Sequence, residues 1–375
     1  MFAFAFGAFS VGLGLGAVGP SLPSMHLRLG APLGSLGLLV AGEYIGSLIA
    51  TMIVGPLLDH RSPRSILIVA TLASIIGFAA LPLAGNLPVA VLALGLAGVG
   101  VGVSAVAAPV LLSRGDGTGE ARALSIINMA FGGGAFLGPL CAGWALDSLH
   151  DYRPVFLAFA ATLVVPLFFF LVAPLPPPGV THRHLVARIP SGIWPAAFLL
   201  AAVSFLYLGA EVGFGSWAYT YVRATTNPGI KLASAVTAAF WLALCLGSLG
   251  SALRPRGWRG DRLVLICGAT AAPSALLFLV APDAHLQILG AFLVGICLGP
   301  IYPLNLGEAA NLYPPAAGQV STLVLCASQI GGALGPWAQG HIVTRSPHLG
   351  VGLTIALCMA LTGAQALFLA FRRDG

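Results

Sequence analysis

Charge is the property that this sequence has least of. Only 7% of its 375 residues are Asp, Glu, Lys or Arg, whereas a soluble domain carries about 25%. Hydrophobic residues make up 58% of the chain, and its mean hydropathy is +0.96. The net charge of +6 does not indicate nucleic-acid binding, because the basic residues are scattered among short loops. We therefore expect a polytopic membrane protein that lies in a lipid bilayer and binds no nucleic acid.

Signatures of catalysis and metal binding are also missing. The six cysteines fall in apolar runs without CxxC spacing, and the eight histidines form no HExxH motif and no Cys/His cluster. Such cysteines are typical of small buried hydrophobic side chains. The glycine runs Gly12–Gly16 and Gly98–Gly102 look like dinucleotide loops, but they lie inside long apolar segments with no βαβ unit. We expect no enzyme activity, no cofactor and no metal.

Twelve apolar runs are each long enough to cross a bilayer, which takes roughly 20 residues in helical form. They lie at residues 1–24, 33–58, 64–84, 87–113, 121–147, 153–173, 194–222, 231–253, 261–281, 285–309, 318–343 and 348–371. A Pro-rich, basic break divides them into two groups of six. The predicted fold is an all-α membrane protein with a six-helix bundle at 1–173, a cytoplasmic linker at 174–193 and a second six-helix bundle at 194–375.

The basic residues indicate the orientation of these spans. With both termini in the cytoplasm, twelve Lys and Arg residues lie on the inner side and five on the outer side, which obeys the positive-inside rule. Arginine outnumbers lysine 16 to 1, as in many GC-rich bacterial proteins. We expect a multi-pass protein of the plasma (inner) membrane with both termini cytoplasmic.

The two halves repeat one another at a shift of 197 residues. Six residues of the fourth and fifth spans coincide with identical residues of the tenth and eleventh spans. The matches are Gly98 with Gly295, Gly102 with Gly299, Gly134 with Gly331, Gly138 with Gly335, Pro139 with Pro336, and Gly143 with Gly340. Two parallel repeats of six spans are an architecture of membrane transporters. The Gly-Pro pairs are expected to kink their helices.

One stretch, YLGAEVGFGSWAYTY from Tyr207 to Tyr221, carries a carboxylate in the middle of an apolar span. A charge near the bilayer centre costs at least ~2.5 kcal/mol, so it is rarely kept without a partner or a use. Tyr207 lies one helical turn before Glu211 and Gly215 one turn after it, so the three share a face. This pattern indicates a polar cavity within a helix bundle.

Between the second and third spans the sequence reads GPLLDHRSPRSIL, which resembles the GxLaDrxGrrxxL loop of the major facilitator superfamily. Gly55, Asp59 and Arg64 fit that pattern, and Arg61 lies between the acid and the second base. The resemblance implies twelve spans in two pseudo-symmetric bundles around one solute site, reached by alternating access. Gly55 is expected to allow close helix contact, and Asp59 to form ion pairs with Arg61 and Arg64 that hold the inner side shut. The alternative is a polar turn that merely follows the positive-inside rule.

Further stretches are similar to one branch of that superfamily, the fucose-permease-like sugar symporters. They are Gly16–Met25, Asn128–Pro139, Tyr207–Tyr221, Gly299–Ala309 and Ser328–Trp337. The resemblance implies a carrier of a sugar-like solute coupled to protons, with sodium as the other option. That branch places coupling acids on its first and fourth spans, and neither span has an acid here.

The acids available for coupling are therefore Glu211, Glu43 in the second span and Glu308 at the inner end of the tenth span. Glu211 and Glu43 are predicted as coupling or substrate groups, with a structural, hydrogen-bonded acid as the alternative. Glu308 is expected to reach the interface and serve the inner gate.

A polyol can be bound by aromatic faces and by amide groups. The candidates for these contacts are Tyr207, Trp217, Asn128, Tyr302, Asn305 and Gln329. Each of them alone could equally serve helix packing.

We thus expect a monomeric secondary transporter that moves a sugar-like or other small polar solute, by proton-coupled symport. The rival is a drug/proton antiporter of the same fold, because GAFLGPLCAG in the fifth span resembles a glycine-proline motif of such exporters. Against it, the fourth span lacks a buried arginine.

Overall fold

The computed structural model describes residues 1–113, 120–173, 175, 189–255 and 257–374. These residues contain twelve helical segments that are long and apolar enough to cross a membrane, which confirms the predicted all-α, twelve-span fold. Large side chains such as Met52, Phe168 and Leu367 are exposed on their surfaces. An apolar outer surface is what a bilayer requires of a protein that lies in it. The protein is therefore a multi-pass membrane protein.

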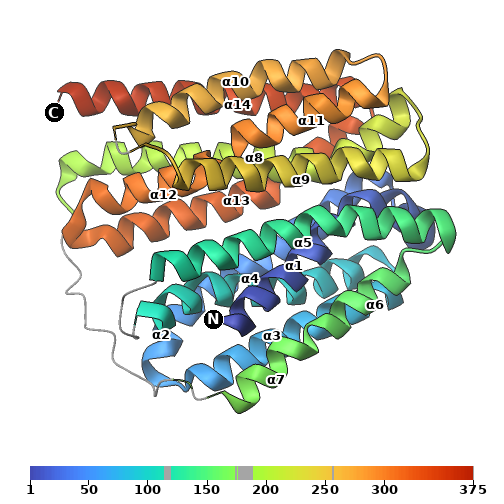
Figure 1. Ribbon diagram of the computed structural model, residues 1–375, viewed down its shortest axis with the longest axis horizontal. Helices are drawn as coiled ribbons and strands as arrows, with labels where there is room; N and C mark the ends of the chain where they lie inside the picture. The colour runs from blue at the N-terminus through green and yellow to red at the C-terminus, as the bar shows by residue number, and fades with distance from the viewer. Residues whose placement is uncertain (114–119, 174, 176–188, 256, 375) are drawn as a thin grey trace. The chain divides into compact units, whose positions relative to one another are not determined.

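The chain divides into two compact units, Met1–Arg183 and His184–Gly375, and each contains six spans (Figure 1). The helices of the first unit are α1 (Phe2–Leu29), α2 (Gly37–His60), α3 (Pro63–Ala80), α4 (Leu87–Ser113), α5 (Glu120–Ser148), α6 (Arg153–Thr162) and α7 (Val164–Val172). Those of the second are α8 (Trp194–Thr225), α9 (Ile230–Ala252), α10 (Gly260–Val280), α11 (Ala284–Leu298), α12 (Ile301–Leu312), α13 (Ala317–Val343) and α14 (Pro347–Asp374). Most of the predicted linker, 174–193, lies outside the described residues.

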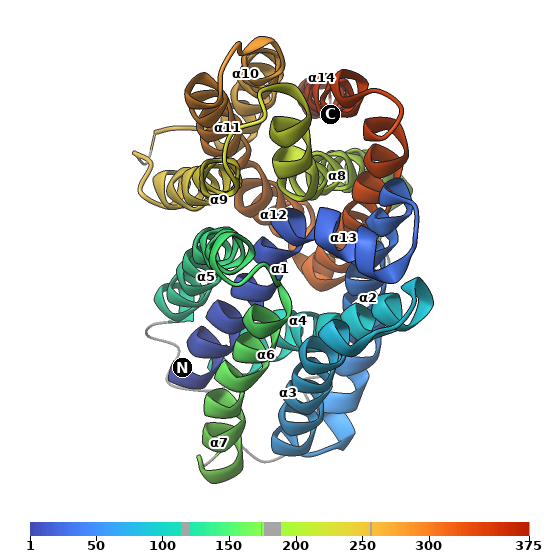
Figure 2. The ribbon, with the colours of Figure 1, turned by 90° about the vertical axis from the view of Figure 1, so that its right-hand side faces the viewer.

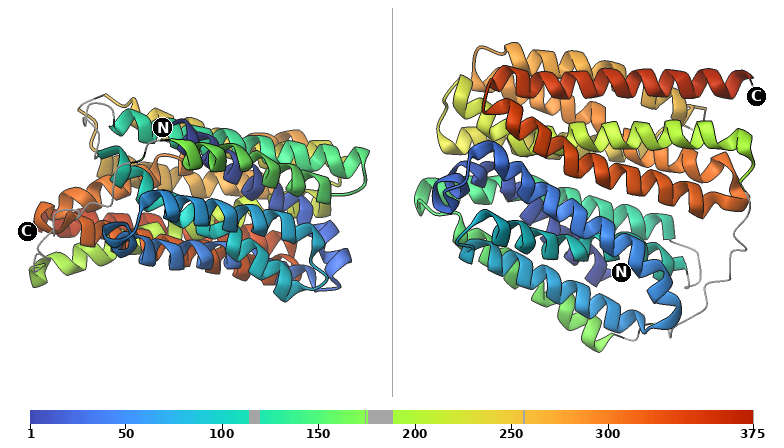
Figure 3. Two further views of the ribbon diagram at one scale, coloured as in Figure 1. Left: turned by 90° about the horizontal axis from the view of Figure 1, so that it is seen from below. Right: turned by 180° about the vertical axis from the view of Figure 1, so that it is seen from behind.

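The same pairs of spans pack together in both halves. In the first half α1 packs along α5 and α2 along α4, and in the second α8 packs along α13 and α9 along α11. Within each half the helices run roughly side by side, as Figures 2 and 3 show. The pairing of spans one and five, and of two and four, thus recurs in the second half as seven and eleven, and eight and ten. The repeat predicted from the glycine pattern is present in the structure.

Equivalent glycines make equivalent contacts in the two halves. A β-carbon at Gly98 would collide with the backbone carbonyl of Glu43, and one at Gly295 with that of Phe240. Both pairs are related by the shift of 197 residues. A helix can press against a neighbouring backbone this closely only where it has no side chain. These glycines therefore set the short α2–α4 and α9–α11 distances.

The sixth span is broken into α6 and α7 at Leu163, a break that the apolar run did not predict. Pro166 has no N–H to donate to the Thr162 carbonyl, one helical turn earlier. The chain tightens at this point, since the Leu163 N–H donates to Ala160 at 3.2 Å and the Thr162 hydroxyl donates to the Phe159 carbonyl at 2.7 Å.

The tenth span is broken into α11 and α12 at Gly299 and Pro300. Neither Pro300 nor Pro303 can donate to the carbonyl one turn before it, which frees the carbonyl of Gly299 from its helical partner. The hydroxyl of Ser248 on α9 donates to that carbonyl at 2.7 Å. A neighbouring helix thus satisfies the backbone group that the proline leaves open, as a membrane interior requires.

Candidate functional site

The strongest cluster of polar side chains at membrane depth lies in the second half, where α8, α12 and α13 meet. Glu211 is buried, and the Tyr207 hydroxyl donates a hydrogen bond to its carboxyl group. The ring of Tyr207 stacks on the ring of Tyr302, with centroids 5.9 Å apart and planes 17° from parallel. The structure thus brings together three of the predicted residues from two separate helices.

Asn305 follows Tyr302 by three positions on α12 and is also buried. Its amide nitrogen donates to the Leu200 carbonyl at 2.8 Å and to the Ser204 hydroxyl at 2.7 Å, both on α8. Its Oδ1 atom has no hydrogen-bond partner among the described residues. The side chain therefore holds α12 against α8 and keeps one acceptor oxygen unused.

Gln329 and Trp217 complete the predicted set in this half. Gln329 is buried on α13, next to Ser328. The indole N–H of Trp217 donates to the Pro336 carbonyl at 2.8 Å, and its side chain is only 1% exposed. This bond ties α8 to α13, so Trp217 packs between helices, and a solute contact by its ring stays a prediction.

Two of the predicted residues, Glu43 and Asn128, belong to the first half. Glu43 lies on α2 with 3% of its surface exposed, and its Oε2 atom has no hydrogen-bond partner among the described residues. Asn128 lies on α5 and is exposed. Glu43 is therefore a buried carboxyl group on the helix that packs against the glycines of α4.

The gating residues predicted from the sequence lie where α2 ends and α3 begins. Among the described residues, no atom lies within 4 Å of the place where a β-carbon of Gly55 would sit. The close helix contact expected at Gly55 stays a prediction. The guanidinium of Arg64 donates to the Ala173 carbonyl at 2.7 Å, at the end of α7. The negative end of the helix dipole also favours a cation at this place. Ion pairs of Asp59 with Arg61 and Arg64 stay a prediction.

An ion cluster at one end of the second half was missed by the sequence reasoning. Asp261, at the start of α10, is 1% exposed and accepts from Arg259 at 2.6 Å and from Arg372 at 3.3 Å. Arg372, on α14, also pairs with Glu308 of α12 at 2.7 Å. The cluster therefore joins α10, α12 and α14. An acid at the first turn of a predicted helix was a signal for it, since helix N-termini favour acids, but Arg372 and Glu308 are far from Asp261 in the chain.

In the first half, where α5 is followed by α6, Asp151 and Arg153 form an exposed ion pair at 2.6 Å. The hydrogen bond from Arg153 lowers the pKa of the Asp151 carboxyl group below its ordinary value. Exposed pairs of this kind contribute little to stability.

Comparisons with known proteins agree with this architecture. The profile of the Major Facilitator Superfamily matches residues 4–336. The chain belongs to this superfamily. It is a membrane transporter of a small-molecule solute, and not an enzyme, because the members of the superfamily are transporters. This confirms the family resemblance predicted from the loop motif.

Individual relatives are distant. Over 372 residues the chain is 28% identical to "Probable nitrate/nitrite transporter NarK2" of Mycobacterium tuberculosis, covering 92% of this chain and 89% of the relative. It is 27% identical over 212 residues to "Glucose/galactose transporter" of Brucella abortus, covering 55% and 48%. The solved structure of a D-xylose-proton symporter superposes with a TM-score of 0.82 at 16% identity, over 97% of this chain and 95% of that one. At that identity the superposition supports the fold alone.

Proposed function

We propose that the protein is a secondary active transporter that moves a sugar-like or other small polar solute by alternating access, in symport with protons. The observation that carries the proposal is the cluster of Glu211, Tyr207 and Tyr302 at membrane depth in the second half. Two stacked aromatic rings offer apolar faces to sugar C–H surfaces, and the adjacent carboxyl and hydroxyl groups can bind solute hydroxyls.

The solute is neutral in this proposal because the spans contain nothing that would balance an anion. Apart from their ends, the twelve spans carry no Lys or Arg. An anion moved into an apolar interior without a paired cation loses its hydration and gains no compensating contact. Nitrate, which appears in the name of the Mycobacterium tuberculosis relative, is therefore not the solute that we propose for this chain. The relative named as a glucose/galactose transporter supports the sugar-like alternative.

The proton is the coupling ion in this proposal because the buried acids stand alone. Neither Glu211 nor Glu43 has a basic residue in its own span except at the span's ends. A lone buried carboxyl group is stable when it carries a proton. Sodium coupling would instead need several oxygen ligands around the ion.

Gln329, Asn305 and Asn128 are proposed as solute-binding amides.

The membrane arrangement follows the charge distribution. We propose a monomer in the plasma (inner) membrane with both termini cytoplasmic, since twelve basic residues then lie inside and five outside. The bundles 1–173 and 194–375 would be joined by a cytoplasmic linker at 174–193. Asp59, Arg61 and Arg64, where α2 ends and α3 begins, would hold the inner side shut.

The test is uptake by the purified protein in proteoliposomes under an imposed inward proton gradient. A panel of labelled monosaccharides should include one that accumulates, while nitrate and a lipophilic cation do not. Accumulation of nitrate would replace the proposal with anion transport, and efflux of the lipophilic cation would replace it with drug/proton antiport. Uptake that only equilibrates the solute, at the same rate with and without the proton gradient, would indicate a uniporter.

The coupling role is tested with Glu211→Gln, which keeps the size of the side chain but cannot carry a proton. We expect this variant to lose accumulation against a gradient and to keep exchange of labelled for unlabelled solute. Asp151→Asn, in the exposed pair with Arg153, is the matched acid-to-amide control and should keep accumulation. Proton-driven accumulation at the wild-type rate in Glu211→Gln would remove Glu211 from the coupling step.

A further inference from the structure

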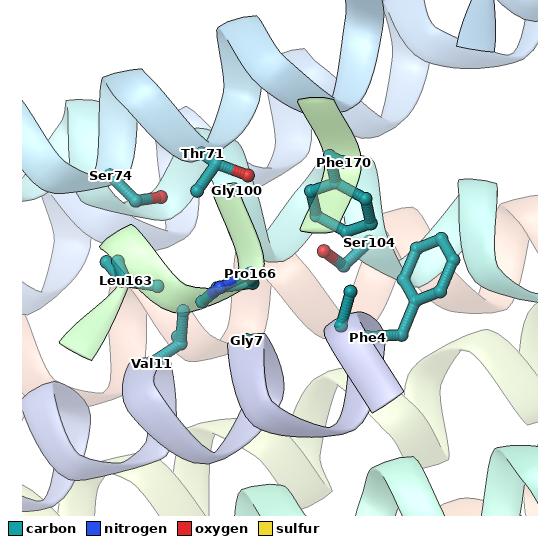
Figure 4. A pocket seen from close by; sticks show the side chains of 11 residues that line it. Phe4, Gly7, Val11, Thr71, Ser74, Gly100, Ser104, Leu163, Pro166 and Phe170 are labelled. Carbon is teal, nitrogen blue, oxygen red and sulfur yellow. The ribbon is translucent and has the colours of Figure 1, made fainter. Parts of the chain in front are cut away.

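A small, partly open cavity in the first half lies away from the residues proposed for transport. It has a volume of about 20 Å³ and lies between α1, α3, α4 and the broken sixth span (Figure 4). Its walls are mainly apolar, with Phe4, Phe170 and Pro166 among the lining residues. A cavity of this size holds one water molecule, since about 10–15 Å³ is enough. Whether it is filled depends on the polar groups in its walls.

Three hydroxyl groups line the cavity, from Thr71 and Ser74 on α3 and from Ser104 on α4. Their oxygen atoms point toward the middle of the cavity in Figure 4. The Thr71 hydroxyl donates its proton to the Leu67 carbonyl at 2.7 Å, and that of Ser74 to the Ala97 carbonyl at 2.8 Å. Each of these two oxygens therefore offers only lone pairs to an occupant.

Ser104 differs from the other two because its hydroxyl has no hydrogen-bond partner among the described residues. In an empty cavity this hydroxyl would be left without water and without a protein partner, which costs free energy. The cavity thus presents two acceptors that have no proton to give and one hydroxyl that can donate or accept. A neutral occupant must donate at least two hydrogen bonds and accept one.

We propose that this cavity is a binding site for one structural water molecule, held by Thr71, Ser74 and Ser104. Water has two protons to donate and two lone pairs, so it satisfies all three hydroxyls at once, and buried waters make about three such bonds. A sodium ion is the alternative occupant of an oxygen-lined site, but the lining residues include no carboxylate to balance its charge. The water bridges α3 and α4 beside the break between α6 and α7.

Two substitutions distinguish a water-filled cavity from a dry one by the sign of their effect on thermal unfolding. Ser104→Ala removes a partner of the water if the site is filled, and removes an unsatisfied buried hydroxyl if it is dry. We expect it to lower the unfolding temperature of the purified protein by about 2 °C or more. Ser10→Ala is the control, since the Ser10 hydroxyl is bonded to the Phe6 carbonyl at 2.9 Å on its own helix.

Gly7→Ala probes the same space from α1. A methyl group there would lie 3.8 Å from the Pro166 side chain, without a clash, and would occupy part of the cavity. If a water is present the methyl displaces it and lowers the unfolding temperature, whereas in a dry cavity it fills a void and raises it. Gly363→Ala on α14 corrects for helix propensity, because no atom lies within 4 Å of its β-carbon position.

The proposal is overturned if Ser104→Ala raises the unfolding temperature above that of the wild type. A rise for Gly7→Ala beyond that of Gly363→Ala would contradict it in the same way. If the wild type unfolds at a higher temperature in sodium chloride than in choline chloride, and Ser104→Ala does not, the occupant is a sodium ion and not a water molecule. An experimental density map that shows ordered waters tests the site directly. We expect a peak within hydrogen-bond distance of the three hydroxyls, and an empty cavity would refute the site.

Discussion

The break in the tenth span leads to a prediction about a single hydroxyl group. Ser248 of α9 donates to the Gly299 carbonyl at 2.7 Å, and that carbonyl is free because Pro303 has no N–H. In Ser248→Ala the carbonyl loses this partner in a region without water. An unsatisfied buried acceptor costs about 1–3 kcal/mol. Since about 2–4 °C corresponds to 1 kcal/mol in a unit of this size, the unfolding temperature should fall by about 2–12 °C.

A second substitution, Pro303→Ala, should remove most of the effect of Ser248→Ala. The Leu304 N–H already donates to the Pro300 carbonyl at 3.3 Å, so α12 nearly continues the helical register of α11. In Pro303→Ala the new backbone N–H is therefore in place to donate to Gly299. Once that bond exists, Ser248 is no longer the only donor to the carbonyl. In the Pro303→Ala background the loss from Ser248→Ala should shrink to below about 2 °C.

The assay is thermal unfolding of the four proteins of this cycle in one detergent, followed by intrinsic fluorescence. Ser251→Ala serves as the control, because Ser251 donates to the Ser248 carbonyl at 2.7 Å, which lies within α9 and keeps its helical partner. It should therefore change the unfolding temperature less than Ser248→Ala does. Equal losses from Ser248→Ala in both backgrounds would refute the assignment of Ser248 as the partner of the carbonyl freed by Pro303.

Two further predictions concern packing and charge in the second half. Gly295→Ala should lower the unfolding temperature by several degrees, because the added methyl group collides with the Phe240 carbonyl and overpacking of this kind costs about 1–3 kcal/mol. Gly307→Ala, with open space at its β-carbon position, should not lower it. Equal unfolding temperatures of the two variants would contradict the packing argument. Arg372→Ala and Glu308→Gln should each lower the free energy of unfolding. The double variant should lose about 0.5 kcal/mol less than the sum of the two single losses, because the pair at 2.7 Å is half-exposed. Strict additivity of the losses in chemical unfolding would show that the pair does not interact.

The sequence alone was sufficient for the twelve spans, because only long apolar helices satisfy their backbone groups inside a bilayer. It was also sufficient for the internal repeat, since glycines that contact a neighbouring backbone cannot be replaced by larger residues. The pairing of Tyr207 with Glu211 followed from the helical period, which places residues four apart on one face. Each of these features depends on one helix at a time or on a comparison of the chain with itself.

Contacts between distant helices required the tertiary structure. The stacking of Tyr302 on Tyr207 joins residues from α12 and α8, and the ion cluster of Asp261 joins α10, α12 and α14. The periodicity of one helix says which side chains share a face, but not which face of another helix they meet. Gly55 shows the same limit, because its loop motif predicted a close contact and no atom of the described residues lies within 4 Å of its β-carbon position. The register and rotation of each helix against its neighbours decide these contacts, and both arise only when the whole bundle packs.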